Sequence, residues 1–237
     1  MPDGAASPTS VLDDGIAVIT LDDGKANAVD HGVLERLDAA LDRALAEEAR
    51  AVVIAGREGR FSAGFDLATM TSSVADMQAL VMRGAHLFMR LYGFALPTVA
   101  ACTGHALAGG AILLLSLDHR VGPDAPAKIG LNEVSIGMGL PIFAVELARD
   151  RLATGHFGAA TMASRLYDPA GAVEAGYLDR VVAADTVVAE AVAEARRLAE
   201  LRTGAYVRTK QLVRRRTIDH ILATLDDDIA SLGGPET

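Results

Sequence analysis

Two short stretches of the sequence place backbone amides where they could stabilise a developing negative charge. Residues 62–67 read SAGFDL and residues 104–111 read GHALAGGA, and each follows an apolar run typical of a buried strand. A strand that passes into a helix through a small-residue turn leaves unpaired N–H groups at the helix start, where the helix dipole favours negative charge. Two such turns side by side would direct two N–H groups at one point, which is the requirement for an oxyanion hole.

The glycine pair Gly109–Gly110 begins an apolar run in the second stretch. Glycine lacks a Cβ atom, so a ligand can approach the backbone closely at these positions. Glycine pairs also occur where a helix packs tightly against a neighbouring element. The residues alone leave both interpretations open, one functional and one structural.

The hydrophobic pattern predicts the elements that must position these turns. Short apolar runs predict strands buried on both faces, and apolar residues at helical spacing predict amphipathic helices between them. Asp13-Asp14-Gly15 predicts a hairpin turn, and the polar, glycine-containing residues 56–64 predict a loop. The expected strands are 16–21, 51–55 and 98–102, and the expected helices are 30–45, 74–94 and 109–117.

The second half of the chain differs in pattern, since residues after about 139 are expected to be mostly helical. Together with the alternating first half, this indicates α/β layering in one domain. We expect a flexible N-terminus over 1–9, a core over 10–185 and a helical C-terminal region of the same domain over 186–237. The first ten residues lack the basic and apolar pattern of a secretory signal.

Composition and charge argue against several classes of protein. The chain has 22 Lys and Arg against 31 Asp and Glu, and this net charge of −9 argues against a nucleic-acid partner. The run Arg214–Arg216 is expected to be a solvated helix face. Residues 94–117 carry no Asp, Glu, Lys or Arg, but their proline and glycines favour a strand, a loop and a buried helix over a membrane span. The single cysteine, Cys102, excludes an intramolecular disulfide and indicates a reducing, cytoplasmic location.

The two glycine-containing stretches, with the strand PTVAAC at 97–102, resemble the crotonase superfamily of enoyl-CoA hydratases and isomerases. Further segments resemble the family in the right order, over roughly residues 10–216 in all. They are KANAV at 25–29, LDHRV at 117–121, IGLNEVSIGM at 129–138 and AVEAGYLDRVV at 172–182. The letters GLNE around Glu133 particularly resemble the Δ3,Δ2-enoyl-CoA isomerases of this superfamily.

The resemblance implies an α/β spiral of ββα units, with a helical C-terminal region that drives assembly into a homotrimer or a dimer of trimers. It implies a coenzyme A thioester as substrate, with no tightly bound cofactor and no metal. By position, the backbone N–H groups of Phe65 and Gly109 would form the oxyanion hole, and Glu133 would be the catalytic carboxylate. The residues assigned to substrate or coenzyme A are Lys25, Ala26, Ala28, Ala63, Asp66, Leu67, Gly110, Ile112 and Lys210.

Several of these side chains also have a purely structural interpretation. Asp66 follows the first donor and is of a type that caps local N–H groups, and Lys210 could be a solvated helix residue near no ligand. Without the resemblance, Glu133 could be a carboxylate on a surface loop. His105, beside the second donor, is either a buried, hydrogen-bonded histidine or a second acid–base group.

The sequence departs from the hydratases at one catalytic position. Hydratases carry two active-site glutamates, and the position of the first, three residues after the oxyanion glycine, is Ile112 here. A single base at Glu133 could still move a double bond, by taking a proton from C2 and returning it at C4. An apolar neighbour such as Ile112 would raise the pKa of Glu133 towards the useful range. The favoured function is therefore an enoyl-CoA isomerase of fatty-acid metabolism; the alternatives are a hydratase and an acyl-CoA-binding protein without turnover.

Overall fold

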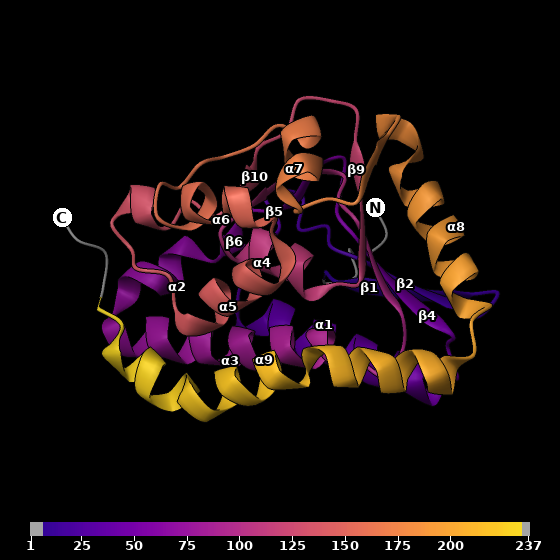
Figure 1. Ribbon diagram of the computed structural model, residues 1–237, viewed down its shortest axis with the longest axis horizontal. Coiled ribbons are helices and arrows are strands. Elements are labelled where there is room, and N and C mark those ends of the chain that lie inside the picture. Colours follow the sequence, from indigo (N-terminus) through magenta and orange to yellow (C-terminus); the bar gives the residue numbers. More distant parts are fainter. Residues whose placement is uncertain (1–6, 234–237) are drawn as a thin grey trace.

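The computed structural model describes residues 7–233, in which a six-stranded sheet lies beside smaller sheets and helices (Figure 1). The order of the large sheet is β1, β2, β4, β7, β9 and β11. The bounds of these strands are Thr9–Asp13, Ile16–Thr20, Ala51–Ala55, Thr98–Ala101, His119–Pro123 and Arg180–Val182. β1 and β2 form the predicted antiparallel hairpin, and the remaining pairs are parallel.

The three-stranded sheet repeats the order of three strands of the large sheet. β5 (Gly59–Ser62), β8 (Gly104–Leu107) and β10 (Ile129–Gly130) form one of them, and β3 (Ala28–Val29) pairs with β6 (Gly64–Phe65). Each of β4, β7 and β9 is followed along the chain by a strand of the three-stranded sheet. The chain therefore winds as a spiral of ββα units, which confirms the expected fold class.

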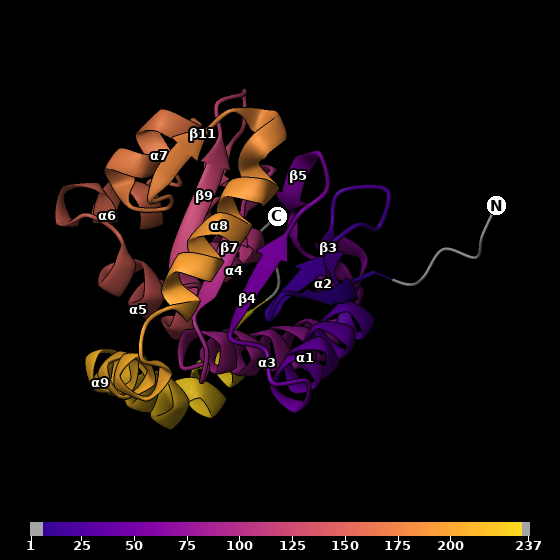
Figure 2. The same ribbon diagram turned by 90° about the vertical axis from the view of Figure 1, so that its right-hand side faces the viewer.

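Helices cover the sheets on several sides. In Figure 2, α8 lies across one face of the large sheet, while α1, α3 and α9 lie below the sheet. The buried residues of the opposite face share one core with α1 and α3. The first four helices are α1 (His31–Ala46), α2 (Leu67–Ser72), α3 (Val74–Tyr92) and α4 (Gly109–Ser116). The later ones are α5 (Ile142–Arg151), α6 (Thr154–Thr161), α7 (Pro169–Ala175), α8 (Val187–Ala199) and α9 (Thr203–Ser231). The helices expected over 30–45, 74–94 and 109–117 are thus confirmed, as is the helical second half.

The loop predicted over residues 56–64 is wrong, because this segment contains β5 and the start of β6. The first two residues of β5 are exposed, so the strand carries no apolar alternation that a sequence pattern could detect. It forms because its backbone approaches β8 very closely. A Cβ atom on Gly104 would lie 2.1 Å from the carbonyl carbon of Gly59, so only glycine permits this pairing.

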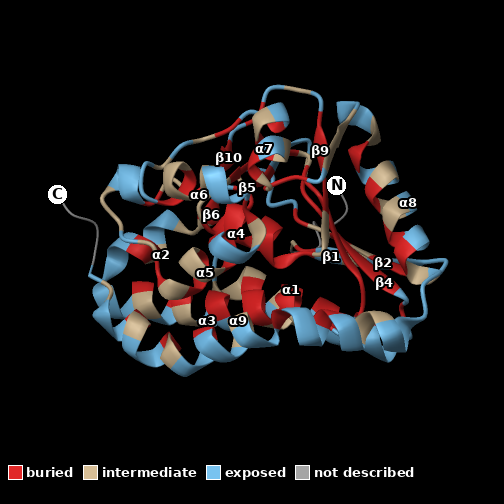
Figure 3. Ribbon diagram, viewed as in Figure 1, coloured by how far each residue is buried: buried red, intermediate tan, exposed pale blue. Residues whose placement is uncertain are grey.

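The uncharged stretch 94–117 divides into β7, β8 and α4, as expected. Every residue of α4 is buried, and the helix appears red in Figure 3. Across residues 7–233, no helix is both long and apolar enough to pass through a membrane. The uncharged stretch is therefore part of the core of this fold.

The flexible segment expected over residues 1–9 lies mostly outside the described part of the chain. Within that part, the carbonyl oxygen of Ser7 accepts a hydrogen bond of 2.5 Å from Arg36 Nε, and Thr9 begins β1. The ordered contacts of the chain therefore begin before residue 10.

A buried group of ion pairs fixes α9 to the sheet. Asp118, in the turn before β9, lies 2.9 Å from Lys210 Nζ and 2.5 Å from Arg214 Nη1. Burial alone would raise the pKa of Asp118, but Lys210 and Arg214 lower it below its usual value. Asp118 is therefore ionised at neutral pH. The prediction that Arg214 belongs to a solvated face is wrong, because the guanidinium group is buried against Asp118, and only Arg215 and Arg216 are exposed.

Replacing Asp118 with asparagine should lower the free energy of unfolding by about 3 kcal/mol or more, because Lys210 and Arg214 would stay buried without a counter-charge. Urea-induced unfolding followed by circular dichroism measures this change. The matched control is Asp227→Asn, which removes a charge at an exposed position of α9 and should change stability by less than about 0.5 kcal/mol. Equal effects in the two variants would contradict the assignment of this group as the anchor of α9.

Candidate active site

The first amide expected to donate belongs to Phe65, on the short strand β6. In the parallel pair of β3 and β6, the Asp66 amide donates to the Val29 carbonyl oxygen at 3.0 Å. Successive amides of a strand point to opposite edges, so the Phe65 amide points away from β3. That direction leads to the start of α4.

The second amide belongs to Gly109, the first residue of α4, and a first helical N–H has no acceptor inside its helix. A Cβ atom on Gly109 would lie 3.3 Å from the Phe65 nitrogen and 3.2 Å from the Phe65 ring. The space in front of the Phe65 amide is therefore open only because residue 109 is glycine. A Cβ atom on Gly64 would lie 2.8 Å from the Gly109 nitrogen, so the two amides that the sequence predicts as donors lie close together.

The residue before each donor has a positive φ, at +91° for Gly64 and +50° for Ala108. Glycine adopts such angles readily, whereas alanine does so at a cost of about 1–3 kcal/mol. Ala108 is held in place because its amide donates to the Gly130 carbonyl oxygen at 3.1 Å and its own carbonyl accepts from Ala111 and Ile112. This strain could not be predicted from the sequence, since alanine is not a residue that marks a positive φ.

Gly110 has a different role from Gly109. A Cβ atom on Gly110 would lie 2.3 Å from the Ser62 carbonyl oxygen, so this glycine permits close packing of α4 against β5. Close packing, the structural interpretation of the glycine pair, therefore holds at Gly110. The assignment of Gly110 to substrate binding stays a prediction.

The ring of Phe65 packs into α3. Its centroid lies 5.9 Å from that of Phe88, which in turn lies 6.2 Å from that of Phe143. Gly84, in the middle of α3, makes room for the ring, since a Cβ atom there would lie 2.4 Å from Phe65. These contacts fix the strand residue whose amide faces the N-terminus of α4.

Glu133 precedes a short 3-10 turn, Val134–Ile136, and its side chain is buried. Its Oε2 atom has no hydrogen-bond partner among residues 7–233. Burial raises the pKa of Glu133 to about 7, and hydrogen bonds from the backbone of Glu133 and Asn132 oppose this effect only in part. The carboxyl group can therefore gain or lose a proton near neutral pH.

Phe65, Ile112 and Glu133 line one small cavity of about 40 Å³, so the structure brings together three residues that the sequence implicated. Apart from Glu133, the side chains that line it are apolar. They include Met70, Met77, Val81, Met138, Phe143 and Leu232. One titratable group thus faces apolar surroundings beside the Phe65 donor.

Ala26 and Ala63 border a separate depression of about 260 Å³. The Ala63 amide donates to the Ala26 carbonyl oxygen at 3.0 Å, which joins these two segments. Arg60, His105 and Lys128 also line the depression. Burial, followed by Arg60 and Lys128, lowers the pKa of His105, and its Nδ1 atom accepts from the Lys128 amide at 2.9 Å. The basic character of this depression could not be predicted from the sequence. Arg60 lies on β5, His105 on β8 and Lys128 just before β10, so only the fold brings these residues together.

The other predicted binding residues lie around these two sites. Lys25 is exposed in a turn whose shape is set by Asp23, which accepts from the amides of Lys25 and Ala28. Leu67 is 68% exposed at the start of α2. Asp66 is the N-cap of α2, which agrees with the structural interpretation of its side chain.

The structure places Lys210 in the ion-pair group of Asp118, so its assignment to the phosphates of coenzyme A stays a prediction. Its side chain is buried, and Nζ bonds Asp118 at 2.9 Å and the Leu96 carbonyl oxygen at 3.2 Å. Arg60 and Lys128, which line the depression beside Ala63, are basic residues of that site.

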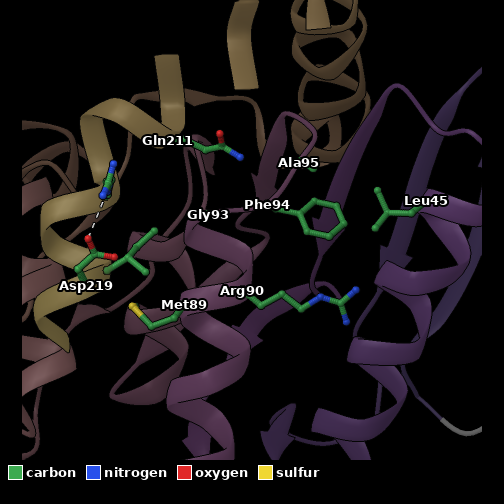
Figure 4. Close-up of a pocket in the computed structure, with 10 residues that line it drawn as sticks. Leu45, Met89, Arg90, Gly93, Phe94, Ala95, Gln211 and Asp219 are labelled. Atoms are coloured by element: carbon green, nitrogen blue, oxygen red, sulfur yellow. Dashed lines mark hydrogen bonds and ion pairs between the residues drawn. The ribbon is translucent and has the colours of Figure 1, made fainter. Parts of the chain in front are cut away.

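A larger groove of about 570 Å³ lies elsewhere, between the end of α3 and α9 (Figure 4). Leu45, Met89, Phe94 and Ile218 give it an apolar wall, with Arg90 and Asp219 at its border. It contains neither of the two donor amides nor Glu133. Size alone therefore does not identify the candidate active site.

Comparisons with known proteins show the family to which the chain belongs. The chain belongs to the enoyl-CoA hydratase/isomerase family, whose model matches residues 12–232. The crystal structure of an enoyl-CoA hydratase/isomerase family protein from Pseudomonas syringae is 40% identical, with a TM-score of 0.93, over 95% of this chain and 98% of that one. An enoyl-CoA isomerase of Mycobacterium tuberculosis is 37% identical, with a TM-score of 0.91, over 94% of this chain and 98% of that one.

Curated relatives carry names of both reactions. Human mitochondrial enoyl-CoA delta isomerase 1 is 32% identical over 174 residues, which are 71% of this chain and 57% of that protein. A probable enoyl-CoA hydratase from Bacillus subtilis is 35% identical over 136 residues, which are 56% of this chain and 52% of that protein. The chain thus spans about half the length of these two relatives. The resemblance to the crotonase superfamily and to its isomerases is confirmed.

Replacing Gly109 with alanine should lower the turnover of an enoyl thioester about 10²–10³-fold, because the new methyl group would fill the space in front of the Phe65 amide. Steady-state kinetics on the purified variant measures the change. Gly155→Ala in α6 is the matched control, since a Cβ atom there meets no atom within 4 Å, and it should leave the rate unaltered. Full activity of the Gly109 variant would contradict the two-amide site.

Proposed function

We propose that this protein is an enoyl-CoA isomerase that moves a double bond from C3–C4 to C2–C3 of an acyl thioester. The observation that supports the proposal is a buried carboxyl group, Glu133, which shares a cavity with Phe65 and whose Oε2 atom has no hydrogen-bond partner among residues 7–233. Moving a double bond needs one base that can also act as an acid. It needs no second group to activate water.

The reaction follows from these groups. The amides of Phe65 and Gly109 bind the thioester oxygen, so charge that develops on this oxygen is stabilised. The Glu133 carboxylate removes a proton from C2, and the electrons of the broken C–H bond pass into a dienolate. The protonated Glu133 then returns this proton at C4, which restores the carbonyl group and leaves the double bond at C2–C3. A carboxyl group with a pKa of about 7 suits both steps at neutral pH.

The position of Ile112 favours isomerisation over hydration. This residue lines the same cavity as Glu133, at the position where a hydratase of the family would carry its other glutamate. The sec-butyl side chain of Ile112 gives a water molecule no polar partner, and a bound water needs two to four of them. Hydration remains the second candidate function, because the cavity of about 40 Å³ has room for a few water molecules and a relative from Bacillus subtilis is named a probable hydratase.

The nucleotide end of coenzyme A fits the depression beside Ala26 and Ala63. Arg60 and Lys128 supply positive charge for phosphate groups, and the backbone of the Ala63 segment leads directly to the Phe65 donor. A thioester bound in this way would place its carbonyl group at the two amides. Coenzyme A enters the proposal as part of the substrate, with no separate cofactor.

We also propose that the protein works as a homotrimer, or as a dimer of trimers, in the cytoplasm. Apolar side chains on the outer surface of α9 support an assembly, because Leu212 and Val213 are 66% and 67% exposed in the single chain. The cytoplasmic assignment rests on Cys102, the one cysteine of the sequence, which is buried as a free thiol.

Replacing Glu133 with glutamine should lower isomerase turnover about 10²–10⁴-fold, since the amide cannot carry the proton between C2 and C4. The wild-type rate should fall as the pH drops through about 7, because the base is then protonated. The assay follows products from 3-enoyl-CoA and 2-enoyl-CoA separately.

The fold of the Glu133 variant can be checked independently. A carboxyl group with a raised pKa destabilises the fold once it ionises, so Glu133→Gln should be more stable than the wild type at pH 8. A stable variant that isomerises at the wild-type rate would refute the proposed role. Hydration of 2-enoyl-CoA by the wild type without isomerisation of 3-enoyl-CoA would favour the second candidate.

Replacing Lys128 with alanine should raise the KM for a coenzyme A thioester about tenfold, because a charged hydrogen bond to phosphate would be lost. The KM for the matching pantetheine thioester, which lacks the nucleotide, should not change. Arg208→Ala removes a positive charge at an exposed position of α9, and it is the control for net charge. An equal rise with both thioesters would show that Lys128 acts other than through the nucleotide.

A further inference from the structure

The cavity beside Glu133 is closed at one end by the residues that follow α9. Leu232 and Gly233 form part of its wall, although they lie about one hundred residues after Glu133 in the chain. Leu232 is half-buried and packs against the main core of the protein. Leu232 and Gly233 therefore form one wall of the cavity.

Two kinds of contact hold this wall. Asp228, in the last turns of α9, accepts a hydrogen bond of 2.7 Å from the amide of Ile142, the first residue of α5. Beyond this point, the Gln78 side chain on α3 donates to the carbonyl oxygens of Ala230, at 3.3 Å, and Leu232, at 3.1 Å. The side chain of Gln78 thus attaches the segment with Leu232 to α3.

The cavity is much smaller than the group it would have to accept. At about 40 Å³ it has room for a few water molecules, whereas ligand pockets commonly measure about 300–1,000 Å³. Met77 and Val81 on α3, Ile112 on α4 and Phe143 on α5 form part of its wall, and Met138, Gly139 and Pro141 come from the segment before α5. Leu232 lies just after α9, and its backbone is linked to α3 by the hydrogen bond from Gln78.

Resting on the function proposed above, we propose that Leu232, held by Gln78, limits the length of the acyl chain and makes short-chain thioesters the preferred substrates. A short acyl group fits between Glu133 and the side chain of Leu232 after small adjustments of the methionines, which are flexible. A long acyl group must displace Leu232 and break the hydrogen bonds from Gln78. The side chain after α9 is therefore a specificity-determining residue.

The test compares the binding of butanoyl-CoA and decanoyl-CoA by calorimetry, so it does not depend on turnover. The wild type should bind butanoyl-CoA more tightly than decanoyl-CoA. Leu232→Ala should shift the ratio of the two dissociation constants towards decanoyl-CoA about tenfold or more, the range found when one methylene is accommodated or refused. Gln78→Leu should shift the ratio in the same direction, since it releases the wall without changing the cavity surface. Leu222→Ala, at an exposed position of α9, should not shift it.

The outcomes separate this proposal from the proposed function. A wild type that already prefers decanoyl-CoA, or a ratio that neither Leu232→Ala nor Gln78→Leu changes, would overturn the role of Leu232. If Leu232→Ala fails to fold, the ratio of dissociation constants measured for Gln78→Leu alone decides whether Leu232 limits the chain length. The same proteins are then assayed with 3-enoyl-CoA thioesters of four and ten carbons. A shifted binding ratio without any isomerisation would refute the proposed function and leave the length limit intact.

Discussion

The site depends on the close approach of β6 to the first turn of α4. A Cβ atom on Gly64 would lie 2.8 Å from the Gly109 nitrogen, and one on Gly110 would lie 2.3 Å from the Ser62 carbonyl oxygen. No side chain larger than hydrogen fits at this contact, so the two elements meet through their backbones. The two donor amides are close to one another because of this contact, and all the chemistry proposed for Glu133 requires them to be there.

Two buried carboxyl groups show how partners decide the effect of burial. Asp118 is buried beside Lys210 and Arg214, and its pKa is lowered. Glu133 is also buried, but it has only weak hydrogen bonds from nearby backbone, and its pKa rises to about 7. Asp118 is a permanent charge that attaches α9 to the sheet, and Glu133 can exchange a proton near neutral pH. The pKa values of the two buried carboxyl groups therefore shift in opposite directions, because only Asp118 has cationic partners.

Helix α9 connects these two places. It is attached near its start by the ion pairs of Asp118, it runs along α3, and its end reaches the cavity of Glu133 (Figure 1). An element far from Glu133 in the sequence thereby shapes the space beside its carboxyl group.

Much of this protein was determined by the sequence itself. The long apolar runs predicted β4, β7 and α4, and the small-residue stretches around Phe65 and Gly109 predicted the paired turns, because periodicity and glycine act locally. Tertiary structure alone decided that Lys210 pairs with Asp118, that β5 forms without an apolar pattern, and that Leu232 borders the cavity of Glu133. Each of these depends on contacts between segments far apart in the chain. The sequence does not show whether a charged or apolar side chain contacts solvent, a counter-ion or a cavity. Only the packing of the folded chain distinguishes these three environments.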